Sequence, residues 1–320
     1  MTLLNVQNLT TYYQIRRGFV RAVEDVSFSL ERGEAMGLAG ESGCGKTTVA
    51  LSLLKILPPN GKIVRGKILL NDLDVVKLSE SELREKIRWK AISLIFQGAM
   101  NAMNPMYKVE DQIVEAIRLH EKGVTKKEAK DRVAKLFEMV GLEPERAKGY
   151  PHEFSGGMRQ RAMIAMALAC NPSILIADEP STALDVIVQA QVLKLLDELK
   201  RKLNLAIIMI SHDLSIISET CDKLAIMYAG RIVEVGDVLS VFKKPLHPYT
   251  QGLIAAFPSI YAPKQEMSAI PGSPPNLLNP PKGCRFAPRC NYSMDICLKE
   301  SPSLIEADKN HFVACHLVHK

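Results

Sequence analysis

Eight residues that follow position 39 constrain the fold of this 320-residue chain more than any other segment. They read Gly40-Glu41-Ser42-Gly43-Cys44-Gly45-Lys46-Thr47 and fit the phosphate-loop pattern G-x-x-x-x-G-K-S/T. An apolar segment, residues 35–39, precedes them, and a helical pattern begins near Lys46. A loop of this kind joins a buried strand to a helix, so the sequence predicts an α/β fold that binds nucleotide phosphates.

The loop supplies each kind of contact that a magnesium nucleotide needs. Its glycines let successive backbone N–H groups turn inward around the β-phosphate, and the helix N-terminus adds positive potential. Lys46 is expected to neutralise β- and γ-phosphate oxygens, and Thr47 to offer its hydroxyl to magnesium. We therefore expect ATP contacts from Gly40, Ser42, Gly43, Cys44, Gly45, Lys46, Thr47 and Thr48.

Two adjacent carboxylates, Asp178 and Glu179, follow the apolar segment 174–177. A short apolar run of this kind is typical of a strand buried on both faces of a parallel sheet. At the end of such a strand Asp178 can hold magnesium, and Glu179 can act as general base toward the water that attacks the γ-phosphate. An Asp-Glu pair is common by itself, but the phosphate loop upstream favours the catalytic interpretation.

A second glycine-containing loop, Ser155-Gly156-Gly157, precedes another helical pattern. An isolated Ser-Gly-Gly tripeptide usually only caps a helix. One ATP does not need two phosphate-reading loops in one chain, so the second loop makes sense if it contacts the γ-phosphate held by a facing subunit. The sequence thus predicts that the protein works as a dimer.

The rest of the pattern fits one α/β domain with additions. Segments that read as strands are residues 3–9, 22–30, 67–70, 91–96 and 205–210. The stretch from about 108 to 147 has helical spacing and is predicted to be a small helical insertion. From about Pro245 onward, prolines that include Pro258 and Pro263 crowd a stretch with little periodicity. We expect this stretch to be an irregular extension.

Composition favours a globular protein without a membrane span. Hydrophobic residues make up 47% and charged residues 24% of the chain, as in ordinary soluble domains. The net charge of +6 comes from Lys and Arg scattered among acidic residues, so no nucleic-acid partner is expected. No apolar run reaches the roughly 18–20 residues of a membrane-spanning helix, and the N-terminus lacks the layout of a signal peptide. We therefore expect a cytoplasmic protein that acts on the membrane through partners.

Taken in order, these motifs resemble those of the ATP-binding subunits of ABC transporters. The resemblance implies a P-loop (RecA-like) core with an antiparallel β subdomain in residues 1–245, and a helical subdomain at about 98–157. An irregular C-terminal extension, residues 246–320, follows.

The same resemblance implies roles for four further residues. Tyr13 looks like the aromatic side chain that stacks on adenine, although neighbouring Tyr12 is an alternative. Gln97 resembles the glutamine that contacts magnesium and the attacking water. Asp185 is similar to an aspartate that acts across the dimer, and His212 to the histidine that contacts the γ-phosphate. A satisfied core histidine is the competing interpretation of His212.

Three motifs in the extension carry a narrower resemblance. They are His247-Pro248-Tyr249-Thr250, Ile270-Pro271-Gly272-Ser273-Pro274-Pro275 and Gly283-Cys284-Arg285-Phe286-Ala287-Pro288-Arg289-Cys290. Together they are similar to the extension of dipeptide and oligopeptide importer ATPases, which brings the resemblance to nearly the whole chain. Related systems carry nickel or short oligosaccharides, and these cargoes stay open as alternatives to peptides.

This resemblance also implies partners. We expect two integral membrane permease subunits, a second ATPase subunit that is either a copy or a paralogue, and, indirectly, an extracellular substrate-binding protein. The chain would then lie at the cytoplasmic face of the cell membrane.

Four of the seven cysteines gather in the extension, at Cys284, Cys290, Cys297 and Cys315. Their spacing differs from the CxxC pairs of zinc ribbons, and a cytoplasmic setting disfavours disulfides. Four thiolates can also hold an iron–sulfur cluster, and some peptide-importer ATPases are similar in carrying a 4Fe-4S centre here. We expect a 4Fe-4S cluster, with zinc or merely reduced thiols as alternatives.

Two other classes of function share parts of this pattern. DNA-repair and chromosome-organising ATPases use similar paired motors, but they place long coiled coils between the two phosphate-reading loops, and this span has no heptad array of that length. An iron–sulfur regulatory module would hydrolyse ATP without binding a permease. Co-purification with membrane partners distinguishes it from a transport motor.

Overall fold

The computed structural model describes residues 2–98, 102–182, 184–256 and 270–318, which divide into two compact units. The first unit contains residues 31–35 and 77–209, and the second contains residues 2–30, 36–76 and 210–320. Pro258 and Pro263 of the proline-rich stretch, and Ala183, lie outside the described residues.

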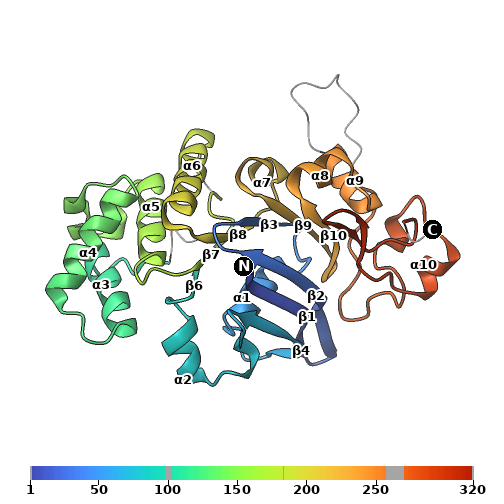
Figure 1. Ribbon diagram of the computed structural model, residues 1–320, viewed down its shortest axis with the longest axis horizontal. Helices are drawn as coiled ribbons and strands as arrows, with labels where there is room; N and C mark the ends of the chain where they lie inside the picture. Colours follow the sequence, from blue (N-terminus) through green and yellow to red (C-terminus); the bar gives the residue numbers. More distant parts are fainter. Residues whose placement is uncertain (1, 99–101, 183, 257–269, 319–320) are drawn as a thin grey trace. The chain divides into compact units, whose positions relative to one another are not determined.

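An antiparallel sheet in the N-terminal part of the second unit confirms the predicted β subdomain. Its strands are β1 (Thr2–Ile15), β2 (Gly18–Glu31), β4 (Gly61–Leu70) and β5 (Leu73–Asp74), in the order β2-β1-β4-β5. Figure 1 labels β1, β2 and β4 in the N-terminal part of the chain. β1 pairs with β4 so that Leu4 lies opposite Leu70 and Val6 opposite Ile68, and all four side chains are buried.

Strands β1 and β2 are longer than the alternation of residues 3–9 and 22–30 predicts. Only Arg16 and Arg17 form the turn between them, so the segment that separates the two predicted strands is mostly strand itself. Its side chains are largely exposed or half-buried. An exposed hairpin end needs no apolar face, so alternation could not reveal it.

Five more strands of the second unit follow the order β11-β12-β10-β9-β3. They are β3 (Ala35–Ala39), β9 (Lys223–Tyr228), β10 (Arg231–Asp237), β11 (Ile305–Asp308) and β12 (His311–Val313). β3 and β9 are parallel, and β10 pairs antiparallel with both β9 and β12. Every residue of β3 is buried, as expected for an apolar strand covered on both faces.

The C-terminal extension shares the hydrophobic core of the second unit. Helices of this unit are α1 (Lys46–Leu53), α7 (Leu214–Thr220), α8 (Val238–Lys243), α9 (Pro248–Ala255) and α10 (Asp295–Lys299). Tyr249 and Phe286 of the extension pack in one buried cluster with Ala39 of β3 and Ile226 of β9. The extension is mostly irregular, as predicted, but its position is fixed by the core that carries the strand before the phosphate loop.

The first unit combines three strands with the helical insertion. Strands β6 (Ile92–Ile95), β7 (Ile174–Asp178) and β8 (Ala206–Ile210) follow the order β8-β7-β6, and β6 and β7 are parallel. Helices α3 (Val109–His120) and α4 (Lys126–Met139) pack side by side and both contact α5 (Gly156–Ala167), which in turn contacts α6 (Val186–Leu203) (Figure 1). The helical spacing of residues 108–147 is thereby confirmed.

A short helix, α2 (Glu80–Glu82), continues as one π-helical turn at Leu83–Ile87 before β6. In the described ranges of the chain, no helix is both long enough and apolar enough to cross a membrane.

Candidate functional site

The phosphate loop lies in the second unit between β3 and α1, as the motif predicts. Gly40 and Gly45 have φ values of 144° and 109°, a region that side-chain-bearing residues rarely adopt. A Cβ at Gly40 would collide with the carbonyl oxygen of Met227, and one at Gly45 with that of Ala22. Glycine is therefore required at both positions by backbone conformation and by close packing.

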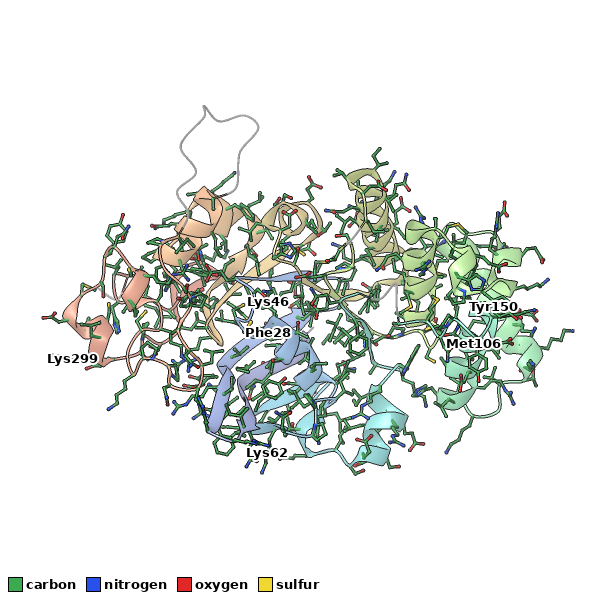
Figure 2. All side chains as sticks on the ribbon, turned by 180° about the vertical axis from the view of Figure 1, so that it is seen from behind. Phe28, Lys46, Lys62, Met106, Tyr150 and Lys299 are labelled. Carbon is green, nitrogen blue, oxygen red and sulfur yellow. The ribbon has the colours of Figure 1, made fainter. Side chains whose placement is uncertain are left out.

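The loop is arranged to receive an anion. The Lys46 side chain is 8% exposed, and its Nζ donates to the carbonyl oxygens of Gly40 at 2.7 Å and Glu41 at 3.1 Å. α1 begins after Gly45, and among the described residues no side chain caps its N-terminus. A helix N-terminus of this kind, next to a buried ammonium, suits the phosphates of ATP. Figure 2 labels Lys46 in this unit.

The two tyrosines that compete for the adenine role have different partners. Tyr12 donates its hydroxyl to Glu24 at 3.0 Å, whereas the Tyr13 hydroxyl lies 3.2 Å from Oγ1 of Thr48, in the helix that follows the phosphate loop. Burial and the nearby Glu24 carboxylate raise the pKa of Tyr12. Tyr13 therefore lies beside the phosphate-loop helix, which favours it, although its contact with adenine stays a prediction.

His212 follows strand β8 and belongs to the second unit. Its side chain is exposed, while the preceding Ser211 is buried and accepts a hydrogen bond from the backbone N–H of Asp213 at 3.0 Å. An exposed imidazole does not fit the interpretation of His212 as a satisfied core histidine. Its contact with the γ-phosphate stays a prediction.

The first unit brings Gln97 and Glu179 together. Glu179 follows β7 directly, and its Oε2 accepts hydrogen bonds from Nε2 of Gln97 at 2.8 Å and from Oγ1 of Thr182 at 3.0 Å. Glu179 also has a φ of 49°, which is uncommon for a residue other than glycine and is typical of functional sites. Asp178 ends β7 and is 2% exposed. Two hydrogen bonds thus orient the carboxylate of Glu179, and its role as general base stays a prediction.

Thr182 was not predicted from the sequence. It stands three residues after Glu179, and its hydroxyl bonds the same carboxylate oxygen as Gln97. A hydroxyl three residues after the predicted general base was the available signal.

The predicted second loop, Ser155-Gly156-Gly157, has clear local roles in the first unit. Ser155 caps α5 and accepts from the backbone N–H of Met158 at 3.3 Å. A Cβ at Gly157 would lie 2.6 Å from Cγ1 of Val188, so α6 requires glycine there. Asp185 likewise caps α6 and accepts from the backbone N–H of Val188 at 2.9 Å. Ser155 and Asp185 thus lie at helix N-termini, and their action on a facing subunit stays a prediction.

The four cysteines of the extension line a single pocket in the second unit, together with His247 and Phe286. None of the seven cysteines, all of which lie among the described residues, forms a disulfide. Burial raises the pKa of the Cys284 and Cys290 thiols and raises that of Cys315 to about 11. Hydrogen bonds from the backbone N–H groups of Phe286 and Ala287 to Cys284 act in the opposite direction and lower the pKa of its thiol. Among the described residues, no group of three or more His, Cys, Asp or Glu side chains is arranged to hold a metal ion.

Two residues of the extension contact the phosphate loop. The sequence motifs include both residues but did not predict these contacts. The Arg289 guanidinium pairs with both carboxylate oxygens of Glu41, at 2.7 and 2.9 Å, and the Tyr249 hydroxyl accepts from the backbone N–H of Glu41 at 2.9 Å. More than two hundred residues separate these partners in the chain. No local pattern predicts a contact of that range.

Comparison with known proteins gives the class of protein. The family model for ABC transporters matches residues 23–182. A cassette solved under the description "Dimeric structure of a post-hydrolysis state of the ATP-binding cassette MJ0796 bound to ADP and Pi" superposes with a TM-score of 0.65 and 25% identity, over 73% of this chain and 98% of that one. The chain therefore belongs to the ABC transporter family, and it is an ATPase of that family.

A second family model narrows the assignment. Residues 233–297 match the model described as the C-terminal region of oligopeptide/dipeptide transporters. The chain is 49% identical to the oligopeptide transport ATP-binding protein OppD of Escherichia coli, over 98% of this chain and 92% of that protein. It is 46% identical to OppD of Bacillus subtilis, over 99% and 89% respectively.

Proposed function

We propose that this ATPase powers the import of di- or oligopeptides through integral membrane permease subunits. The observation that carries the proposal is similarity over nearly the whole length, extension included, to proteins named as oligopeptide transport ATP-binding proteins. The test is to purify the complex with its membrane partners and to measure which ligand, presented by its binding protein, stimulates ATP hydrolysis. Peptides should stimulate it. Stimulation by nickel or oligosaccharides instead of peptides would show that the assignment of peptides as the cargo is wrong.

In this proposal each predicted residue has one role in ATP hydrolysis. Lys46 would neutralise the β- and γ-phosphates, Thr47 and Asp178 would hold magnesium, and Glu179 would take the proton from the attacking water. Magnesium supplies charge neutralisation on the phosphate oxygens when bound. Gln97 orients the Glu179 carboxylate through its 2.8 Å hydrogen bond, which supports the pairing of these two side chains in catalysis.

We further propose that two ATPase subunits face one another. Val186 and Ile187, which follow Asp185 at the start of α6, are 82% and 73% exposed. Large apolar side chains exposed side by side are typical of interaction surfaces. The second subunit would be a copy of this chain or a paralogue, and both would lie at the cytoplasmic face of the membrane.

The permease subunits would dock on the helical insertion. Met106 and Tyr107, just before α3, are 78% and 60% exposed (Figure 2 labels Met106). Replacing both with glutamate should reduce co-purification with membrane partners without changing the hydrolysis rate of the isolated subunit. Leu239, 69% exposed on α8 and outside the insertion, provides a control, and Leu239→Glu should leave co-purification unchanged. Equal loss in the control would argue against this docking surface.

We also propose that Cys284, Cys290, Cys297 and Cys315 hold a 4Fe-4S cluster. Support comes from their common pocket and from the backbone N–H groups that bond the sulfurs of Cys284, Cys290 and Cys315. A single zinc ion would draw all four sulfurs to about 2.3 Å from one point, whereas a cluster distributes its ligands over several irons.

Anaerobically purified protein tests the cluster. It should be brown and contain iron and acid-labile sulfide in near-equal amounts, and Cys297→Ser should lose both. Cys221→Ser is the matched control, because Cys221 lies outside this pocket lining and should keep both. Stoichiometric zinc without sulfide would overturn the cluster and leave a thiolate metal site.

A further inference from the structure

The C-terminal extension reaches the phosphate loop through one loop residue, Glu41. Arg289 holds the side chain of Glu41 with two parallel hydrogen bonds, and Tyr249 accepts from its backbone N–H. The remaining polar group of Glu41, its carbonyl oxygen, accepts from Nζ of Lys46 at 3.1 Å. Three side chains thus converge on one residue of the loop, and one of them is the lysine expected to bind phosphate.

Arg289 is rigidly supported for this contact. Its side chain is 5% exposed, and its Nε donates to the carbonyl oxygen of Pro271 at 2.7 Å. The guanidinium carbon lies 5.6 Å from the ring centroid of Tyr228 and 6.0 Å from that of Phe286. These contacts hold the planar guanidinium in one orientation. Its bidentate pairing with the Glu41 carboxylate therefore fixes the orientation of that carboxylate in addition to attracting it.

Tyr249 is supported in a similar way. It is fully buried, and its ring centroid lies 4.6 Å from that of Tyr228 and 5.4 Å from that of Phe286. Its hydroxyl is the acceptor for an N–H group at the very start of the loop. A shift of the Glu41 backbone would therefore break a partly buried hydrogen bond, which is costly.

We propose that Arg289 and Tyr249 are positioning residues for ATP binding, which hold Glu41 and, through its carbonyl oxygen, Lys46 in the geometry that receives phosphate. The extension would then influence nucleotide affinity through Glu41, without touching the nucleotide itself. This proposal rests only on the assignment of the chain as an ATPase. It does not depend on the identity of the cargo or on the four-cysteine site.

The test compares Arg289→Gln with Arg285→Gln in the purified full-length protein. Arg285 is an equally buried arginine of the extension, 5% exposed in its side chain, but it pairs with Glu24 and the Ala229 carbonyl oxygen. Arg289→Gln should raise the Kd for ATP, and the KM for hydrolysis, by about tenfold with kcat changed much less, since misplacement of a binding group is costly. Arg285→Gln should leave both within about twofold. Arg289→Lys, which keeps the charge but not the fork, should fall between wild type and Arg289→Gln.

A double-mutant cycle separates positioning from general destabilisation. If Arg289 acts through Glu41, Glu41→Gln should raise the Kd for ATP by itself, and Arg289→Gln should add little in that background. Tyr249→Phe keeps the ring packing and removes only the hydroxyl, so it should weaken ATP binding while thermal unfolding stays close to wild type. An unchanged Kd in both Arg289→Gln and Tyr249→Phe, an equal rise in Arg285→Gln, or additive effects of Arg289→Gln and Glu41→Gln would each overturn the proposal.

Discussion

The substitution Glu179→Gln removes a charge and a proton acceptor and leaves the shape of the side chain. In the structure the carboxylate accepts two hydrogen bonds at one oxygen, from Gln97 at 2.8 Å and from Thr182 at 3.0 Å. The amide oxygen of the substituted glutamine can accept both. We therefore expect a loss of less than about 1 kcal/mol in the free energy of unfolding, the size of one ordinary hydrogen bond.

Hydrolysis should respond far more strongly than stability. General-base catalysis typically contributes about 10²–10⁴-fold to the rate, which corresponds to about 2.7–5.4 kcal/mol of activation free energy. We expect kcat to fall by that amount, ATP affinity to stay, and an ATP-bound dimer to accumulate because hydrolysis no longer separates it. Phosphate release and size-exclusion chromatography with ATP measure the two effects.

Thr182→Val provides the control for Glu179→Gln. It removes one hydrogen bond to the same carboxylate oxygen but keeps the charge, so kcat should fall by no more than about tenfold. Hydrolysis by Glu179→Gln within a factor of about three of wild type would show that another group accepts the proton.

Three further outcomes are expected. Lys46→Ala should weaken ATP binding by about 10- to 100-fold, because hydrogen bonds to charged groups contribute about 1.5–3 kcal/mol. Lys55→Ala is the control and should keep the affinity, because Nζ of Lys55 bonds the Val76 carbonyl oxygen at 2.8 Å. Similar ATP affinities of the two variants in calorimetry would contradict the role of Lys46. Ser155→Arg should abolish dimerisation and keep ATP binding by the monomer. Ser155→Ala loses the α5 cap without adding bulk, so it should still dimerise. A wild-type dimer fraction in Ser155→Arg would refute the facing-subunit geometry. Burial, with the nearby Glu121 carboxylate, raises the pKa of Cys170 to about 11, so its thiol stays protonated at neutral pH. Iodoacetamide should therefore label Cys170 much more slowly in the folded than in the unfolded protein, as measured by peptide mass spectrometry. Equal labelling rates would argue against this burial.

The sequence predicted those parts of the fold that local patterns determine. The strand, glycine loop and helix around Lys46 follow from a motif whose residues are contiguous, and α3 and α4 follow from apolar spacing that their buried faces require. The hairpin end at residues 10–21 escaped because an exposed strand carries no apolar face. Within the site, Thr182 and the hydrogen bond from Gln97 to Glu179 depend on where β6 and β7 end in space.

The contacts of the extension escaped for a different reason. Arg289 and Glu41 are one charged pair among many possible pairs in a chain with 41 basic and 35 acidic residues. Only the buried cluster that contains Tyr249 and Phe286 brings them together, and that cluster draws on strands and loops from distant parts of the second unit. Sequence motifs identified these extension residues without indicating what they touch.

The most direct test of the proposed function is ATP-driven uptake of a labelled peptide into proteoliposomes that contain the reconstituted complex and its binding protein. Uptake should require ATP on the side of this subunit and should stop when Glu179→Gln replaces the wild-type chain. Peptide uptake that continues unchanged with Glu179→Gln, or a complex that hydrolyses ATP but accumulates no peptide, would contradict the account.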